Sequence, residues 1–151
     1  SNFRERIRNK AKEIGFEKVL NPLKEGFEET LKEITNGQGP DAIIIAVGAT
    51  KAYKQVFNIA PIQCRILIFA ASFPEPEWDI TPNLVHYKLW EIIGAYGSTL
   101  KAYQESADLL NRRELKISPL IEQKFPLCNI QEAFKKASTP GNFRVSIIMP
   151  D

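Results

Sequence analysis

The side chains that carry most enzyme chemistry are scarce in this chain. Its 151 residues include one histidine, His86, and two cysteines, Cys64 and Cys128. A closed zinc site needs four protein ligands, and a histidine-based hydrolase needs a nucleophile beside its base. His86 has no serine or cysteine near it in the sequence, and we interpret the two cysteines as small hydrophobic residues. We therefore predict no catalytic residue and no metal ligand.

Three clusters of small residues could instead bring the backbone close to a ligand. They are Val47-Gly48, Phe69-Ala70-Ala71 and Ala95-Tyr96-Gly97, and each follows an apolar run. In open α/β sheets, ligands bind outside the carboxyl ends of parallel strands. Any one cluster could simply make a tight turn, because small residues suit turns as well as close approach. Three clusters at equivalent strand ends favour a pocket.

The apolar runs before these clusters are predicted to be strands of one parallel sheet. Residues 42–47 are continuously apolar, which is typical of a strand covered by helices on both faces. Further strands are expected at residues 19–20, 66–70, 90–93, 120–125 and 145–149. Helical spacing predicts helices near residues 3–14, 27–34, 53–60, 100–111 and 130–137, and the proline-rich segment 72–83 is predicted to be a loop. This alternation indicates an α/β fold.

Composition limits the partners and the compartment. The chain has 20 Lys and Arg against 18 Asp and Glu, and this balance lacks the basic footprint of a nucleic-acid-binding protein. No apolar run approaches the roughly 20 residues that span a bilayer, so no membrane partner is expected. No signal-peptide pattern opens the chain, and two cysteines make no disulfide framework. We therefore expect a cytoplasmic protein.

A series of short motifs extends over essentially the whole chain. AKEIG at residues 11–15 precedes VLNP at 19–22, and GPD at 39–41 leads into AIIIAVG and, later, ILIFAASFP. HYK at 86–88 is followed by IGAYGS at 93–98. The chain closes with FPL, IQEAF and GNFRV, which occupy residues 125–127, 130–134 and 141–145. In this order the motifs resemble the zinc-dependent medium-chain alcohol and polyol dehydrogenases, especially the sorbitol and threonine dehydrogenase branch.

The resemblance covers only the carboxyl-terminal part of that family. The GxGxxG phosphate loop, the catalytic zinc ligands and the four-cysteine zinc site are absent from this sequence. The implied fold is a partial Rossmann-type parallel sheet that lacks the first two strands and is flanked by helices. Residues 1–97 would form the partial dinucleotide-binding domain. Residues 98–151 would form the segment that returns to the catalytic domain in the family.

The absence of two strands would leave a gap beside residues 42–47. An unpaired edge of this apolarity favours association, so we expect one of two outcomes. Either the strand at residues 19–20 closes up beside it, or another chain fills the gap. Family members dimerise through the last Rossmann strand, which implies a homo-oligomer formed through the edge strand Trp90–Ile93.

The resemblance also implies a nicotinamide cofactor and a set of residues at its ribose and nicotinamide ends. Val47 and Gly48 would lie under the two riboses. The residues expected to border the nicotinamide are Ala70, Ala71 and Ser72, and those expected to offer backbone groups to its carboxamide are Ala95 and Tyr96.

Three further residues would contact the phosphates and the adenosine ribose. Arg144 matches a basic position that reaches the pyrophosphate, which suits the bidentate geometry of a guanidinium. Asn2 stands where NAD-dependent members have an acidic residue on the ribose 2′-hydroxyl. Arg4 could instead accept a 2′-phosphate, so the cofactor is NAD or NADP.

The implied function is hydride transfer from a secondary alcohol or polyol to NAD(P). This chain would be the cofactor-binding and carboxyl-terminal part of the enzyme, inactive alone, while zinc would act from a domain that the chain lacks. Two alternatives stay open. The chain could be a truncated, non-catalytic dimerisation or nucleotide-binding module, or a fragment of a zinc-independent quinone reductase.

Overall fold

The chain folds into two units in the computed structural model, which describes residues 3–139 and 141–150. Residues 22–99 form one unit, called here the sheet unit. The described parts of residues 1–21 and 100–151 form the other, called the terminal unit. Of the predicted site residues, Asn2 lies outside the described residues. Arg4 lies on the first helix, and its side chain is likewise outside the description.

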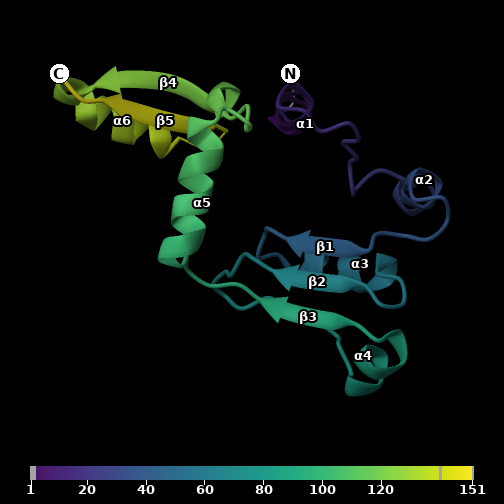
Figure 1. The fold of residues 1–151 in the computed structure, drawn as a ribbon. Coiled ribbons are helices and arrows are strands. Elements are labelled where there is room, and N and C mark those ends of the chain that lie inside the picture. Colours follow the sequence, from purple (N-terminus) through teal and green to yellow (C-terminus); the bar gives the residue numbers. More distant parts are fainter. Residues whose placement is uncertain (1–2, 140, 151) are drawn as a thin grey trace. The chain divides into compact units, whose positions relative to one another are not determined.

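The sheet unit is built on three parallel strands (Figure 1). They are β1 (Ala42–Ile45), β2 (Arg65–Ile68) and β3 (Glu91–Gly94), adjacent in that order. Ile44 pairs with Leu67, and Leu67 pairs with Ile93. The crossovers contain α3 (Thr50–Ile59) and α4 (Pro82–Lys88), and α2 (Phe27–Ile34) precedes β1. Parallel strands joined by helices confirm the predicted α/β class.

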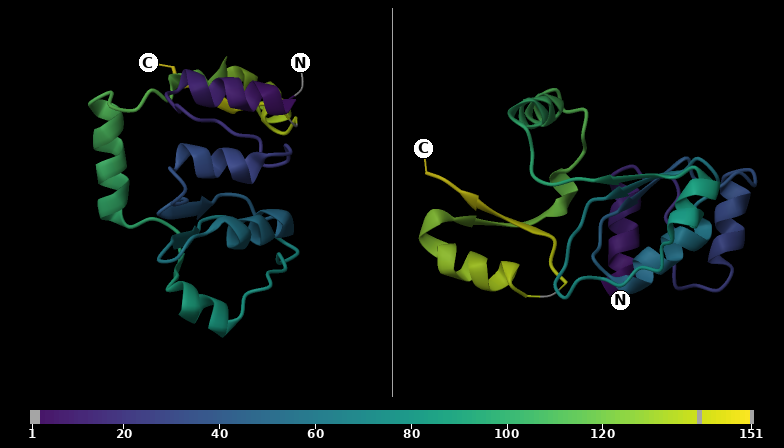
Figure 2. Two further views of the ribbon diagram at one scale, coloured as in Figure 1. Left: turned by 90° about the vertical axis from the view of Figure 1, so that its right-hand side faces the viewer. Right: turned by 90° about the horizontal axis from the view of Figure 1, so that it is seen from below.

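The core of this unit lies between the sheet and the two crossover helices. Both helices lie on the same side of the three strands (Figure 2). The most buried members are Cys64 and Ile66, which expose none of their surface. Trp90 stacks on Phe57 at 5.7 Å and donates a hydrogen bond from its indole N–H to the carbonyl of Pro61 at 2.7 Å. This bond satisfies the polar edge of a buried tryptophan.

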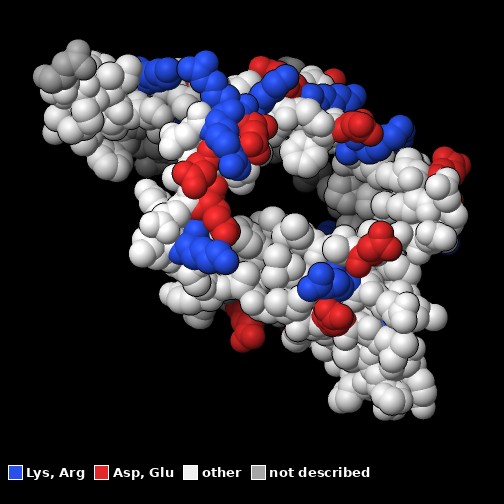
Figure 3. All heavy atoms as spheres, viewed as in Figure 1, with Lys and Arg blue, Asp and Glu red and all other residues white. Residues whose placement is uncertain are grey.

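The opposite face of the sheet is exposed, which corrects one expectation. Ile44 on β1 is 64% exposed and Ile93 on β3 is 37% exposed, with half-buried Leu67 between them. The surface over these strands carries few charged side chains in Figure 3. A continuously apolar strand therefore does not have both faces covered within the described residues. The helices that pack on this sheet, α3 and α4, reach only the other face.

Helix α4 lies largely outside the predicted elements. Its first two residues fall in the segment predicted to be a loop. The Thr81 side chain accepts a hydrogen bond from the Leu84 N–H at 3.2 Å, and Pro82 occupies the first turn. A threonine cap followed by proline is a strong start signal for a helix. Pro74, Pro76 and Pro82 favoured a loop in this segment, so the start of the helix was not predicted.

The terminal unit combines segments from both ends of the chain. It contains α1 (Phe3–Glu13), α5 (Leu100–Asn111) and α6 (Ile130–Ala137). Its two strands, β4 (Ile121–Pro126) and β5 (Arg144–Ile148), are parallel neighbours joined through α6. Short 3-10 turns at Ser118–Leu120 and Leu127–Asn129 flank β4. No described helix in either unit has the length and apolarity needed to cross a membrane.

Two expectations about sheet edges need correction. Residues 19–20 form no strand, and among the described residues β1 pairs only with β2, so the expected closure of the gap by this segment is wrong. A two-residue extended segment gains ladder hydrogen bonds only when a partner strand lies beside it. Trp90 precedes β3 and is 5% exposed, so its side chain belongs to the core and is not available at the edge. The strand at this edge of the sheet is Glu91–Gly94, one residue later than expected.

Candidate cofactor site

An open pocket of about 520 Å³ lies at the carboxyl ends of β2 and β3. The residues after β2 line one side and those after β3 line the other. Four predicted site residues therefore meet here, namely Ala70, Ala71, Ala95 and Tyr96. The remaining lining residues are Ile68, Phe69, Gly94 and Gly97. Parallel strands end at the same edge of the sheet, which is why residues 25 positions apart come together.

The backbone around this pocket is partly used by the sheet. The N–H groups of Phe69 and Ala70 both donate to the carbonyl of Ile45, at 3.1 and 3.0 Å. The Ala95 N–H donates to the carbonyl of Ile68 at 3.1 Å. The N–H groups of Ala71 and Tyr96 have no partner among the described residues. A ligand would therefore meet the Tyr96 N–H and the Ala95 carbonyl, rather than the Ala95 N–H.

Gly48 and Ser72 lie in direct contact at the end of β1. The Ser72 hydroxyl donates a hydrogen bond to the Gly48 carbonyl at 2.6 Å. A Cβ atom at position 48 would lie 2.4 Å from the Ser72 Cβ and 2.9 Å from its backbone nitrogen. Glycine is required here because the next loop crosses directly over it. Val47 beside it is 55% exposed. The structure thus brings together Gly48 and Ser72, two of the predicted residues.

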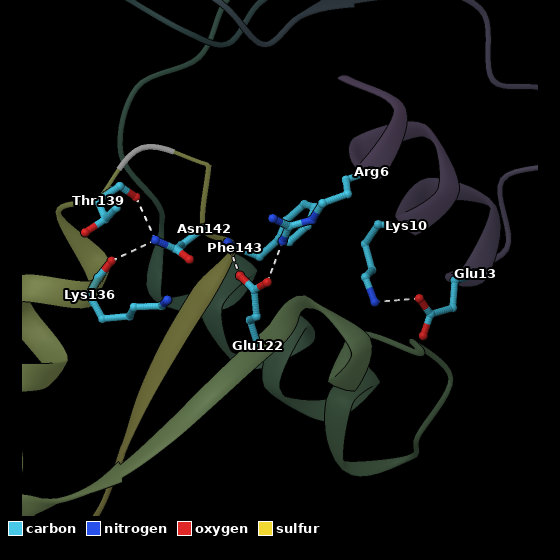
Figure 4. A network of polar contacts seen from close by, with 8 residues as sticks. All are labelled: Arg6, Lys10, Glu13, Glu122, Lys136, Thr139, Asn142 and Phe143. Atoms are coloured by element: carbon cyan, nitrogen blue, oxygen red, sulfur yellow. Dashed lines mark hydrogen bonds and ion pairs between the residues drawn. The ribbon is translucent and has the colours of Figure 1, made fainter. Parts of the chain in front are cut away.

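Arg144 lies in the terminal unit, at the start of β5. The preceding residue, Phe143, donates its N–H to the Glu122 carboxylate at 2.9 Å, while Arg6 pairs with the same carboxylate (Figure 4). The Arg6 guanidinium also lies 5.5 Å from the centre of the Phe143 ring. Glu122 therefore ties α1 to the beginning of β5 and fixes the backbone that carries Arg144.

A second open pocket, also of about 520 Å³, adjoins this network. Arg6, Asn9 and Lys10 of α1 line it, together with Glu122 and Phe143. Both cations are paired, Arg6 with Glu122 and Lys10 with Glu13 (Figure 4). Arg4 was among the predicted site residues, whereas Arg6 was not. The contact of Arg6 with Glu122, 116 residues away, has no signal in the local sequence.

The contacts of Glu122 make the stability of this unit pH-dependent. The Phe143 N–H, and then the Arg6 charge, hold the pKa of the Glu122 carboxyl below its ordinary range. A carboxyl whose pKa is lower in the folded state stabilises the fold at neutral pH. That contribution is lost as the pH falls through the folded-state pKa. Glu122→Gln should therefore be less stable than the parent chain at pH 7, and the difference should vanish well below about pH 4.

Urea unfolding followed by circular dichroism at both pH values measures this difference. Glu17→Gln is the matched control, since Glu17 is an exposed carboxylate of the same unit with no partner among the described residues. A loss of stability in Glu122→Gln that is the same at both pH values would contradict the electrostatic role of this carboxylate.

The histidine and the two cysteines do not lie together in one site. Burial, and to a smaller extent the Asp41 carboxylate, raises the pKa of the Cys64 thiol, which keeps it protonated and unreactive. Cys128 is exposed, so only Cys64 packs as a small hydrophobic residue. His86 lies on α4, where its ring contacts that of Tyr87 at 5.1 Å. Within the described ranges, no three His, Cys, Asp or Glu side chains are placed to hold a metal ion.

The sequence over residues 3–112 matches the pattern of the zinc-binding dehydrogenase family. That match spans well over half of the chain. The chain belongs to the zinc-binding dehydrogenase family. This assignment confirms the resemblance inferred from the ordered motifs, and it accounts for the parallel sheet with helical crossovers.

Relatives and solved structures of the family agree with this assignment. The L-threonine 3-dehydrogenase of Pyrococcus furiosus is 30% identical over 137 residues, covering 89% of this chain and 38% of the relative. An alcohol dehydrogenase from Thermotoga maritima superposes with a TM-score of 0.83 at 19% identity, covering 97% of this chain and 41% of that one. An Escherichia coli alcohol dehydrogenase solved with NADH gives a TM-score of 0.78 at 20% identity, covering 97% and 42%.

This member of the zinc-binding dehydrogenase family spans less than two fifths of the length of the curated relatives it matches. The shares run from 32% for a Haemophilus influenzae alcohol dehydrogenase-like protein to 39% for the D-arabitol-phosphate dehydrogenase of Enterococcus avium. The solved structures named above support the shared fold. The activity of a whole dehydrogenase is a separate inference.

Proposed function

We propose that this chain forms part of the nicotinamide-binding site of a dehydrogenase that oxidises a secondary alcohol or polyol. The proposal is based on the pocket at the carboxyl edge of the parallel sheet, which is lined by Ala70, Ala71, Ala95 and Tyr96. A bound nicotinamide cofactor would accept the hydride from the alcohol carbon. NADH in the similar Escherichia coli enzyme supports this cofactor class.

The hydrogen-bonding groups at this edge suit a carboxamide. A carboxamide presents an oxygen that accepts and an NH₂ group that donates. The unpartnered Tyr96 N–H could donate to the oxygen, and the adjacent Ala95 carbonyl could accept from the NH₂ group. Backbone groups fixed at strand ends would hold the ring in one orientation without a charged side chain. Small residues on both sides leave room for a flat ring.

The role of Arg144 toward the pyrophosphate is a second part of the proposal. Its position at the start of β5 is fixed by the Phe143–Glu122 hydrogen bond, so the backbone beneath it is well anchored. A guanidinium can bind two phosphate oxygens at once. The described residues contain no set of zinc ligands, and we assign no step through zinc to them.

Titration of NADH and NADPH into the chain by calorimetry tests the proposal. We expect binding in the millimolar range or tighter for at least one of the two cofactors. Arg144→Ala should weaken it by about tenfold or more, because a hydrogen bond to a charged group contributes roughly 1.5–3 kcal/mol. The titration also shows which of the two cofactors is preferred.

Lys124→Ala is the matched control, since Lys124 is an exposed cation on β4, the strand paired with β5. This variant should bind as the parent does. Equal weakening of cofactor binding in both variants would show that Arg144 acts only through its general positive charge. No detectable binding of either cofactor by the folded chain would contradict the proposed site.

The same proposal covers the assembly, the domains and the compartment. We propose a homo-oligomer through the outer edge of β3, which has a neighbour on only one side in the described sheet. Residues 1–97 would contribute to the dinucleotide-binding domain and residues 98–151 to the segment that returns to the catalytic domain. Cys64 and Cys128 are both free thiols, which suits a cytoplasmic location.

A further inference from the structure

A separate pocket of about 430 Å³ lies on the α3 side of the β2 end. Its lining includes three aromatic side chains, Tyr53 on α3 and Phe73 and Trp78 on the loop after β2. Ile68, Ala70 and Ala71 complete one side, so the pocket adjoins the proposed nicotinamide pocket. No sequence pattern predicts this pocket, because Tyr53 belongs to an expected helix and Trp78, 25 residues later, belongs to the proline-rich segment expected to be a loop.

The charge that lines this pocket is negative. Within the described part of the chain, Glu75 is the only charged residue that lines it, and no described lysine, arginine or histidine belongs to its lining. The nearest basic residue along α3, Lys54, is paired with Asp79 at 3.3 Å. An exposed carboxylate at the rim of an aromatic pocket attracts cations and repels anions.

Two of the three aromatic side chains that line the pocket are accessible to a ligand, since Trp78 is 40% exposed and Phe73 is fully exposed, whereas Tyr53 is only 4% exposed. The rings of Tyr53 and Trp78 meet at 88°, with centres 5.8 Å apart. Phe73 is fully exposed, so its ring can cover a ligand without giving up internal packing. Accessible aromatic rings beside a carboxylate can attract an alkylammonium group, because a ring face attracts a cation.

The loop that carries these residues is anchored, so the pocket is part of the fold. Trp78 packs against Phe57 at 5.7 Å as well as against Tyr53. The Glu77 N–H donates to the Thr50 hydroxyl at 3.2 Å, and the Ser72 hydroxyl holds the start of the loop on Gly48. The Tyr53 hydroxyl donates to the Ala70 carbonyl at 3.4 Å, which fixes the ring that forms the inner wall.

We propose that this pocket is a binding site for a small alkylammonium ligand, held by the exposed rings of Phe73 and Trp78 and by the charge of Glu75, with Tyr53 as its inner wall. The proposal does not rest on the proposed nicotinamide function, although the two pockets share the wall formed by Ile68, Ala70 and Ala71. Its ligand carries a positive charge on a compact, methylated or alkylated nitrogen. Anionic ligands are excluded by Glu75.

Choline chloride, titrated into the full chain and followed by NMR, tests this site. The chain has two tryptophans, and their indole N–H signals report two different places. The Trp78 signal should shift with a dissociation constant on the order of millimolar. The Trp90 signal should stay unchanged, because its N–H is bound to the Pro61 carbonyl in the core. Sodium chloride at the same concentration corrects for ionic strength.

Two comparisons decide whether the charge is recognised. The uncharged isostere of choline, 3,3-dimethylbutan-1-ol, should bind at least about fivefold more weakly, and Glu75→Gln should weaken choline by a similar factor. Glu77→Gln is the matched control, since Glu77 lies two residues away and does not line the pocket. Equal binding of choline and its isostere would overturn the proposal, as would unchanged choline affinity in a folded Glu75→Gln variant.

Discussion

Ile66→Ala should lower the free energy of unfolding of the sheet unit by about 3 kcal/mol. Ile66 exposes none of its surface and lies on the central strand, packed in the cluster with Ile45, Val56 and Trp90. Removing three carbons there deletes apolar burial and leaves a cavity that a strand between two neighbours cannot close by moving. A loss of this size is a large share of the stability of a small unit.

The matched control is Ile44→Ala, on the neighbouring strand and in the same sheet. Ile44 is 64% exposed, so the same chemical change removes little burial and should cost less than about 1 kcal/mol. Both tryptophans of the chain lie in the sheet unit, so urea unfolding followed by tryptophan fluorescence reports this unit. Similar losses in the two variants would show that the face bearing Ile44 is covered in solution.

Gly48→Ala should lower the free energy of unfolding by about 2 kcal/mol and disturb the proposed cofactor site. The added Cβ would lie 2.9 Å from the backbone nitrogen of Ser72, so the loop after β2 must move as a whole. That shift would break the 2.6 Å hydrogen bond between the Ser72 hydroxyl and the Gly48 carbonyl. It would also displace Ala70 and Ala71, which line the nicotinamide pocket.

Gly94→Ala provides the control for this effect. Gly94 is also a strand-end glycine of the same sheet, but a Cβ there would meet no atom within 4 Å. Its backbone is extended, so alanine should be tolerated with a change within about 0.5 kcal/mol. Urea midpoints for the two variants, measured under one set of conditions, compare them directly. If Gly94→Ala destabilised the unit as much, the close contact with Ser72 would not be the cause.

The sequence predicted most elements of this fold because their signals are local. The apolar run at residues 42–47 contains β1, and helical spacing at residues 27–34 and 130–137 gives the observed bounds of α2 and α6. Gly15, expected to end the first helix, has a φ of 109° just after Glu13, the last residue of α1. Residues 19–20 failed as a strand because pairing is not local, and no neighbouring strand completes it.

The candidate site was likewise predictable in part from local sequence and in part only from the fold. By itself, the sequence determined that small residues follow three parallel strands, and parallel strands must end at one edge. Only the tertiary structure decided which groups at that edge are available. The ladder uses the N–H groups of Phe69, Ala70 and Ala95, and leaves that of Tyr96.

Side-chain contacts between residues far apart in the chain could not be predicted from the sequence either. Glu122 meets Arg6 across 116 residues, Tyr53 meets Trp78, and Ser72 crosses Gly48. Each pair depends on where separate elements are packed, and no periodicity or composition specifies that. The sequence thus determined the family, the elements and the strand ends. Packing alone decided the exposed sheet face and the aromatic pocket, because burial is a property of neighbours brought together by the fold.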